Sequence, residues 1–65
     1  MENNERTIKY QWPIPYKPEN DFEDMRQRDM AAESARQWAG RQDLWVDVVA
    51  INRGRKNLIV ELVVR

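Results

Sequence analysis

The side chains that could do covalent chemistry in this chain are few. Among 65 residues there is no His and no Cys, and the hydroxyl nucleophiles outside the tyrosines are Ser34 and Thr7. A serine or threonine needs a neighbouring base to become a nucleophile, and the imidazole that most often serves is absent. Without Cys there is no thiolate, no disulfide and no cysteine-ligated metal site. We therefore expect no catalytic residue, no metal ligand and no cofactor, and we interpret the chain as non-enzymatic.

A second possible chemistry is electrostatic recognition by a short basic segment. Arg53, Arg55 and Lys56 surround a glycine in a stretch that suits the turn of a β-hairpin. Cations at the tip of a β-ribbon can bind nucleic-acid phosphates. The whole chain offers no attraction of this kind, because 11 basic and 11 acidic residues leave a formal net charge of zero. An ordinary solvated turn is the simpler interpretation of these three charges, and nucleic-acid binding is the alternative.

The charge is nevertheless divided unevenly along the chain. Residues 1–33 hold eight acidic and five basic side chains, whereas residues 34–65 hold three acidic and six basic ones. The molecule is therefore polarised, and we expect electrostatic specificity to lie in the basic turn and in the acidic start of the predicted helix.

The elements that must position these side chains follow from the spacing of apolar residues. Thr7 to Trp12 alternates polar and apolar side chains, which predicts a half-buried strand that ends before Pro13. Two further apolar segments, Leu44 to Ile51 and Leu58 to Val64, predict a second and a third strand. A three-residue loop at 52–54 would join them and would let directly paired residues share the parity of their numbers.

In that register Val48 would pair with Leu58, and Val46 with Val60. Gly54 would take a positive φ in the loop. The apolar set facing the core would then contain Leu44, Val46, Val48, Ala50, Leu58, Val60, Leu62 and Val64.

A helix is predicted between the first two strands. It begins at Asn20 or Asp21, because Asn20 and Glu23 have the spacing of a capping box. It runs to Ala39, with Gly40 as a left-handed stop. Small side chains recur on the same face of its second half, which would let the helix approach a sheet closely; this face contains Ala31, Ala32, Ala35, Trp38 and Ala39.

These elements predict an α+β fold with the order β-α-β-β. We expect a disordered tail at residues 1–6 and one small domain at residues 7–65, built as a three-stranded mixed sheet of order 1-3-2 with the helix on one face and a C-terminal β-hairpin. The longest apolar run is four residues, 48–51, against the roughly 20 that a membrane span needs. The first six residues are polar and are not those of a secretory signal, so we expect a cytoplasmic protein with no membrane partner.

One helix can cover only one face of such a sheet, and the other face would still carry apolar side chains. We expect these to be an interface; they are Trp45, Val49, Ile51, Ile59 and Val63. Burying them would be worth roughly 1.5–3 kcal/mol each, which for so short a chain is a large contribution. A second copy of the chain or another protein could cover them. Alternatively, the aromatic arm at residues 12–16 could fold back over this face within one chain.

The leading functional hypothesis is a non-catalytic protein-binding module. We expect it to be homodimeric and to regulate or inhibit a partner protein by occupying its surface, with no small-molecule substrate. In outline only, such a short β-α-β-β chain resembles accessory inhibitors that phages and other mobile elements encode. The alternative hypothesis is a nucleic-acid-binding protein that uses the basic hairpin tip, with Arg53, Arg55 and Lys56 as the contacts.

Overall fold

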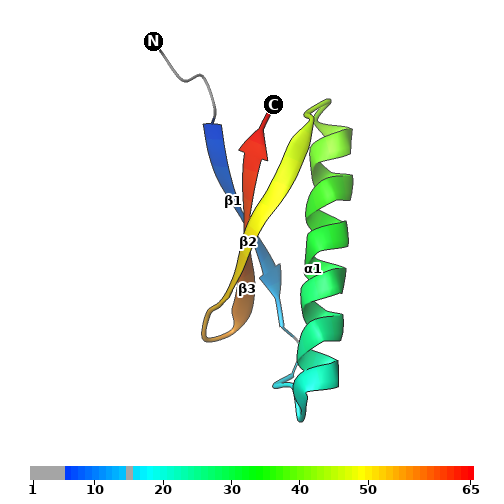
Figure 1. The fold of residues 1–65 in the computed structure, drawn as a ribbon, viewed down its shortest axis with the longest axis vertical. Coiled ribbons are helices and arrows are strands. Elements are labelled where there is room, and N and C mark those ends of the chain that lie inside the picture. The colour runs from blue at the N-terminus through cyan, green and yellow to red at the C-terminus, as the bar shows by residue number, and fades with distance from the viewer. Residues whose placement is uncertain (1–5, 15) are drawn as a thin grey trace.

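The computed structural model describes residues 6–14 and 16–65, which form three strands and one helix in the order β-α-β-β (Figure 1). The elements are β1 (Arg6–Pro13), α1 (Asp21–Arg41), β2 (Val46–Arg53) and β3 (Asn57–Val64). The predicted α+β fold and element order are confirmed. Of the expected tail at 1–6, residues 1–5 lie outside the described residues, and Arg6 is already the first residue of β1.

The three strands form one sheet in which β3 lies between β1 and β2. The predicted order 1-3-2 is therefore confirmed. The prediction of a mixed sheet is wrong, because β3 runs antiparallel to both of its neighbours. β1 and β2 run in the same direction, but they lie on opposite edges and never pair. Every strand pairing consequently involves β3.

The first strand follows the alternation predicted from its sequence. Tyr10 pairs with Val60 and Trp12 with Leu58, so the apolar side chains of β1 lie on the same side of the sheet as the buried side chains of β3. The Tyr10 ring also lies 5.8 Å from the ring of Trp38 in α1, centroid to centroid. This aromatic pair is a direct link between the edge strand and the helix.

The register of the C-terminal hairpin differs from the predicted one. Val48 pairs with Leu62, not with Leu58, and a β-bulge follows at Val49. After the bulge the parity is reversed, and Arg53 pairs with Leu58. The prediction failed first in the position of the turn, which lies further along the chain than 52–54, so that Val48 pairs four residues further along β3 than expected. It failed also in assuming unbroken alternation along β2, because an extra residue in one strand moves all later side chains to the other face.

The turn of this hairpin also lies further along the chain than predicted, at 54–56 and not at 52–54. Gly54 donates its N–H to the carbonyl of Asn57 at 2.7 Å, which leaves Arg55 and Lys56 between them. Gly54 does not take the positive φ that we expected. The space beside Gly54 is limited instead, because a Cβ there would lie 2.6 Å from Oδ1 of Asn57, whose side chain would have to move.

The start of α1 is as predicted, and its end is not. The side chain of the N-cap residue Asn20 accepts a hydrogen bond from the N–H of Glu23 at 2.9 Å. Gly40 is helical, and the left-handed conformation falls at Asp43, with φ 58°. The N–H of Leu44 then returns to the carbonyl of Ala39 at 2.9 Å. Among the described residues, no helix combines the length and apolar character needed to cross a bilayer.

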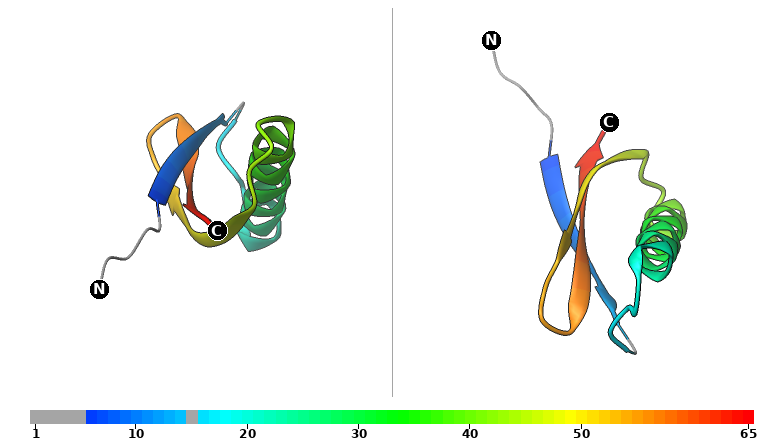
Figure 2. Two further views of the ribbon diagram at one scale, coloured as in Figure 1. Left: turned by 90° about the horizontal axis from the view of Figure 1, so that it is seen from above. Right: turned by 60° about the horizontal axis from the view of Figure 1, so that its bottom comes forward.

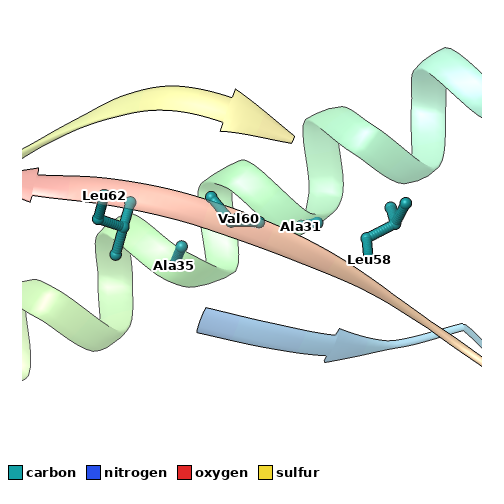
Figure 3. Close-up of a cluster of buried hydrophobic side chains, with 5 residues drawn as sticks. All are labelled: Ala31, Ala35, Leu58, Val60 and Leu62. Atoms are coloured by element: carbon teal, nitrogen blue, oxygen red, sulfur yellow. The ribbon is translucent and has the colours of Figure 1, made fainter. Parts of the chain in front are cut away.

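The core lies between one face of the sheet and the alanine face of α1, which stands on one side of the sheet only (Figure 2). Ala31 and Ala35 are fully buried against three fully buried side chains of β3, namely Leu58, Val60 and Leu62 (Figure 3). The predicted small-residue face is confirmed. Its alanines let the helix axis come close to the central strand, so a single layer of β3 side chains fills the space between them.

The bulge makes a testable difference between two neighbouring β-branched residues. Ile51 packs against the core, whereas the side chain of Val49 is largely exposed. We expect Ile51→Thr to lower the free energy of unfolding by about 1–3 kcal/mol, and Val49→Thr to change it by about 0.5 kcal/mol or less. Urea denaturation of both variants measures these values, and an equal loss in the two would contradict the bulged register.

Candidate functional site

The open face is the side of the sheet that points away from α1, and it contains most of the predicted interface. Ile59 and Val63 lie in its centre on β3 and are half-buried. Val49, in the bulge, is 56% exposed, and Trp45, just before β2, is 80% exposed. Ile51 does not belong to this surface, because the bulge turns it towards the helix and into contact with the core. Ala50, predicted for the core, is opposite Glu61 instead.

Polar pairs surround the two central apolar side chains of the open face. Asn52 donates from Nδ2 to Oε2 of Glu61 at 3.0 Å, and Arg65 Nε lies 2.7 Å from Oδ2 of Asp47. On the β1 side, polar residues of the edge strand alternate with the buried ones; they are Thr7, Lys9 and Gln11. Glu61 lies on the central strand between Ile59 and Val63, so apolar and hydrogen-bonded polar side chains alternate across the open face. The face is more polar than the sequence led us to expect.

The aromatic arm does not cover this face. Trp12 and Ile14 pack against the core on the helix side of the sheet. Tyr16 is 58% exposed, and its carbonyl accepts a hydrogen bond from Nε2 of Gln27 in α1 at 3.1 Å. The described residues of the arm are thus held on the helix side, and Pro15 lies outside the described residues. The alternative in which the arm folds back over the open face is wrong for the residues that the structure places.

Arg53 does not stand free at the hairpin tip, because the bulge turns it towards α1. Its Nη2 is hydrogen-bonded to Oδ1 of Asp24, and the same nitrogen donates to Oε1 of the buried Gln27 at 3.3 Å. Arg28 binds the other oxygen of Asp24 at 3.0 Å and donates from Nη1 to the carbonyl of Ile51 at 2.7 Å. These side chains tie the first half of α1 to β2, and they take one of the three predicted cations out of the tip.

The contacts with Arg53 and Arg28 change the pKa of the Asp24 carboxylate. Hydrogen bonds from Arg53, then from Arg28, lower the pKa of Asp24 below its usual range, because both stabilise the ionised form. Arg55 and Lys56, which are exposed in the turn, take no part in this contact. The predicted electrostatic contact is consequently reduced to these two residues.

Two further surface features lie wholly or partly outside the predicted site. The outer side of α1 carries exposed apolar side chains: Phe22 at 70%, Met25 at 62% and Met30 at 50%. Of these three residues, only Met30 could be predicted as exposed from the sequence, because it falls among polar residues on the helix. At the other end of α1, an open cavity of about 370 Å³ is lined by Arg36, Gly40, Asp43, Leu44, Trp45 and Val46. In the part of the chain that the structure describes, no three acidic side chains gather as metal ligands would.

Comparisons of this chain with family models, with curated proteins and with solved structures found no match.

The Asp24 contact predicts a shift that a titration can follow. In Arg53→Gln the pKa of Asp24 should rise towards its usual range, whereas in Arg55→Gln it should stay where it is. A carboxyl-detected NMR titration of the two variants measures both values. Because the folded-state pKa is lowered, ionised Asp24 stabilises the fold above about pH 4, and this contribution is lost as the pH falls through the lowered value. The stability difference between the wild type and Asp24→Asn should therefore narrow in acid, and a difference that stayed constant would contradict the contact.

Proposed function

We propose that this chain is a non-catalytic protein-binding module that acts by occupying the surface of a partner protein. The observation that carries the proposal is the exposure of two large apolar side chains along β2 and just before it, since Trp45 is 80% exposed and Val49 56%. An exposed tryptophan contributes a large apolar area once a partner covers it, and tryptophan is among the residues that dominate binding energies. Ile59 and Val63 extend the apolar area along β3.

The paired polar side chains of the open face agree with a protein partner. Protein interfaces combine an apolar centre with a polar rim whose groups are hydrogen-bonded. The cross-strand pairs Asn52–Glu61 and Asp47–Arg65 are already formed, so a contact could include them without leaving a charge unpaired. Electrostatic specificity would come from Arg55 and Lys56 at the hairpin tip and from the acidic start of α1, since like charges on a wrong partner would be repelled.

A module of this kind would regulate or inhibit by exclusion. A partner whose surface is covered by the open face would lose access to its own substrate or its own partner, and no reaction on this chain is needed for that effect. This function agrees with the scarcity of nucleophiles and bases in the sequence.

Differential capture tests the proposed surface. The tagged chain is compared with Trp45→Ser/Val49→Ser, which alters the open face, and with Phe22→Ser/Met25→Ser, which alters equally exposed side chains on α1. A protein that binds the wild type and the α1 variant but not the open-face variant would support the proposal. Retention by all three would show that the open face is not the binding surface. Because the replaced side chains are largely exposed, circular dichroism should show the same fold in each.

The alternative function, nucleic-acid binding, is tested at the hairpin tip. Labelled single-stranded and duplex DNA and RNA are titrated at low and high salt against the wild type and Arg55→Ala/Lys56→Ala. Under our proposal no micromolar binding is expected even at low salt, because the engagement of Arg53 with Asp24 leaves two exposed cations in the turn. Tight binding that falls steeply with salt and is lost in the variant would favour the alternative.

A further inference from the structure

The two edges of the sheet differ in how far they are closed to another strand. β2 is interrupted by the bulge at Val49, and Arg28 occupies the carbonyl of Ile51 with a hydrogen bond of 2.7 Å. Bulges and side chains that bond to the outer backbone are devices that keep an edge from pairing with another chain. The β2 edge is therefore protected at its middle.

β1 carries no such interruption, because its residues pair with β3 in one continuous register from Arg6 to Pro13. The N–H of Ile14 donates to the carbonyl of Lys56 at 2.9 Å, which fixes the phase of the ladder. Residues in antiparallel pairs alternate between bonding to the neighbour and facing away from it. Trp12, Tyr10 and Ile8 therefore turn their backbone groups to β3, and the N–H and C=O groups of the intervening residues face outwards; these residues are Thr7, Lys9 and Gln11.

We propose that this β1 edge pairs antiparallel with the β1 edge of a second copy of the chain, with Tyr10 at the two-fold axis. The occupant follows from the self-complementarity of the strand. With Tyr10 opposite its own copy, Lys9 is opposite Gln11, Ile8 opposite Trp12, and Thr7 opposite Pro13. The outward N–H and C=O groups of Lys9 and Gln11 then bond to each other across the axis in both copies.

The two neighbouring registers of this strand pair are less favourable than the one centred on Tyr10. Centring the pair on Lys9 would place two ammonium groups directly opposite each other, which is destabilising. Centring it on Gln11 would place Lys9 opposite Pro13, whose lack of an N–H removes one bond from each pair. In the register centred on Tyr10, Pro13 faces Thr7 at the end of the ladder and still offers its carbonyl as an acceptor.

The pairing would also complete the cover of the core at the β1 edge. Ile8, Tyr10 and Trp12 are only half-buried within one chain, and they lie on the same side of the sheet as α1. In the dimer each gains a cross-strand apolar neighbour on that side. A two-fold axis perpendicular to the sheet keeps both helices on one face and joins the two open faces into one six-stranded surface.

This inference deepens the proposed function, because the joined open faces would be the binding surface, but it can fail separately. An interface made by one strand from each copy is at the small end of the range for specific contacts, so we expect a dimer that dissociates at micromolar concentrations. Sedimentation velocity between about 1 µM and 1 mM covers that range.

The decisive variant is Gln11→Pro, with Gln11→Ala as its matched control. Both remove the side-chain bond that Oε1 of Gln11 accepts from Asn57. Only the proline removes the outward N–H and places a ring on the edge, and it leaves the ladder to β3 intact. We expect the dimer dissociation constant to rise at least about tenfold in Gln11→Pro and to change little in Gln11→Ala. Ile59→Lys, on the open face, should leave it unchanged.

Hydrogen exchange gives a second measurement that does not depend on a variant. The amides of Lys9 and Gln11 should exchange more slowly at high protein concentration than at low, whereas the amide of Tyr10, which is bonded to β3, should not depend on concentration. Monomers at every concentration would overturn the proposal. So would a dimer that survives Gln11→Pro and is lost in Ile59→Lys, which would place the seam on the open face and leave the proposed function standing.

Discussion

One extra residue in an edge strand determines most of what this small chain presents to its surroundings. The bulge at Val49 allows Val46 and Val48, and then Ile51, to face the helix, although unbroken alternation would turn Ile51 outwards. The same change of parity turns Arg53 towards α1, where it meets Asp24 and Gln27. Without the bulge the helix would lose an apolar neighbour and a charged tie at once. The core, the electrostatics and the open face are therefore consequences of a single local irregularity.

Few apolar side chains are available for the core, and the fully buried ones lie along the contact between α1 and β3. Ala31 and Ala35 bring the helix close to β3, whose alternate side chains are fully buried. Little apolar area remains to hold the ends of α1, and polar contacts serve there: the side chain of Gln27 is buried, yet its amide both donates and accepts a hydrogen bond. Apolar side chains that this layer cannot include, such as Trp45 and Phe22, stay exposed. Binding of a partner would remove these exposed apolar side chains from water, which is why we propose a binding function.

Sequence reasoning predicted what depends on local periodicity and capping. The strand around Tyr10, the alanine face, the Asn20 cap and the strand order were all available from spacing and chain connectivity. It could not predict the bulge, because Val48-Val49-Ala50-Ile51 is apolar throughout and offers no alternation in which a break would show. From that one omission followed the placement of Ile51 on the open face and the assumption that Arg53 was free. The wrong hairpin register came from placing the turn at 52–54, which is too early in the chain. The left-handed residue at the end of α1 was assigned to Gly40 for a similar reason: the sequence identifies glycine as permissive but not where the chain must turn, which is at Asp43.

The position of β3 in the sheet has a consequence for biosynthesis. Both outer strands pair only with β3, and β3 is the last of the four elements to leave the ribosome. Until it emerges, β1 and β2 have no partner, and the alanine face of α1 has only the valines and the isoleucine of β2 and the apolar side chains of β1 to contact. Folding of this domain must therefore wait until translation of the β3 segment is complete. During that interval the apolar segments of the nascent chain stay exposed to solvent. A chaperone that binds unfolded chains would bind at this stage.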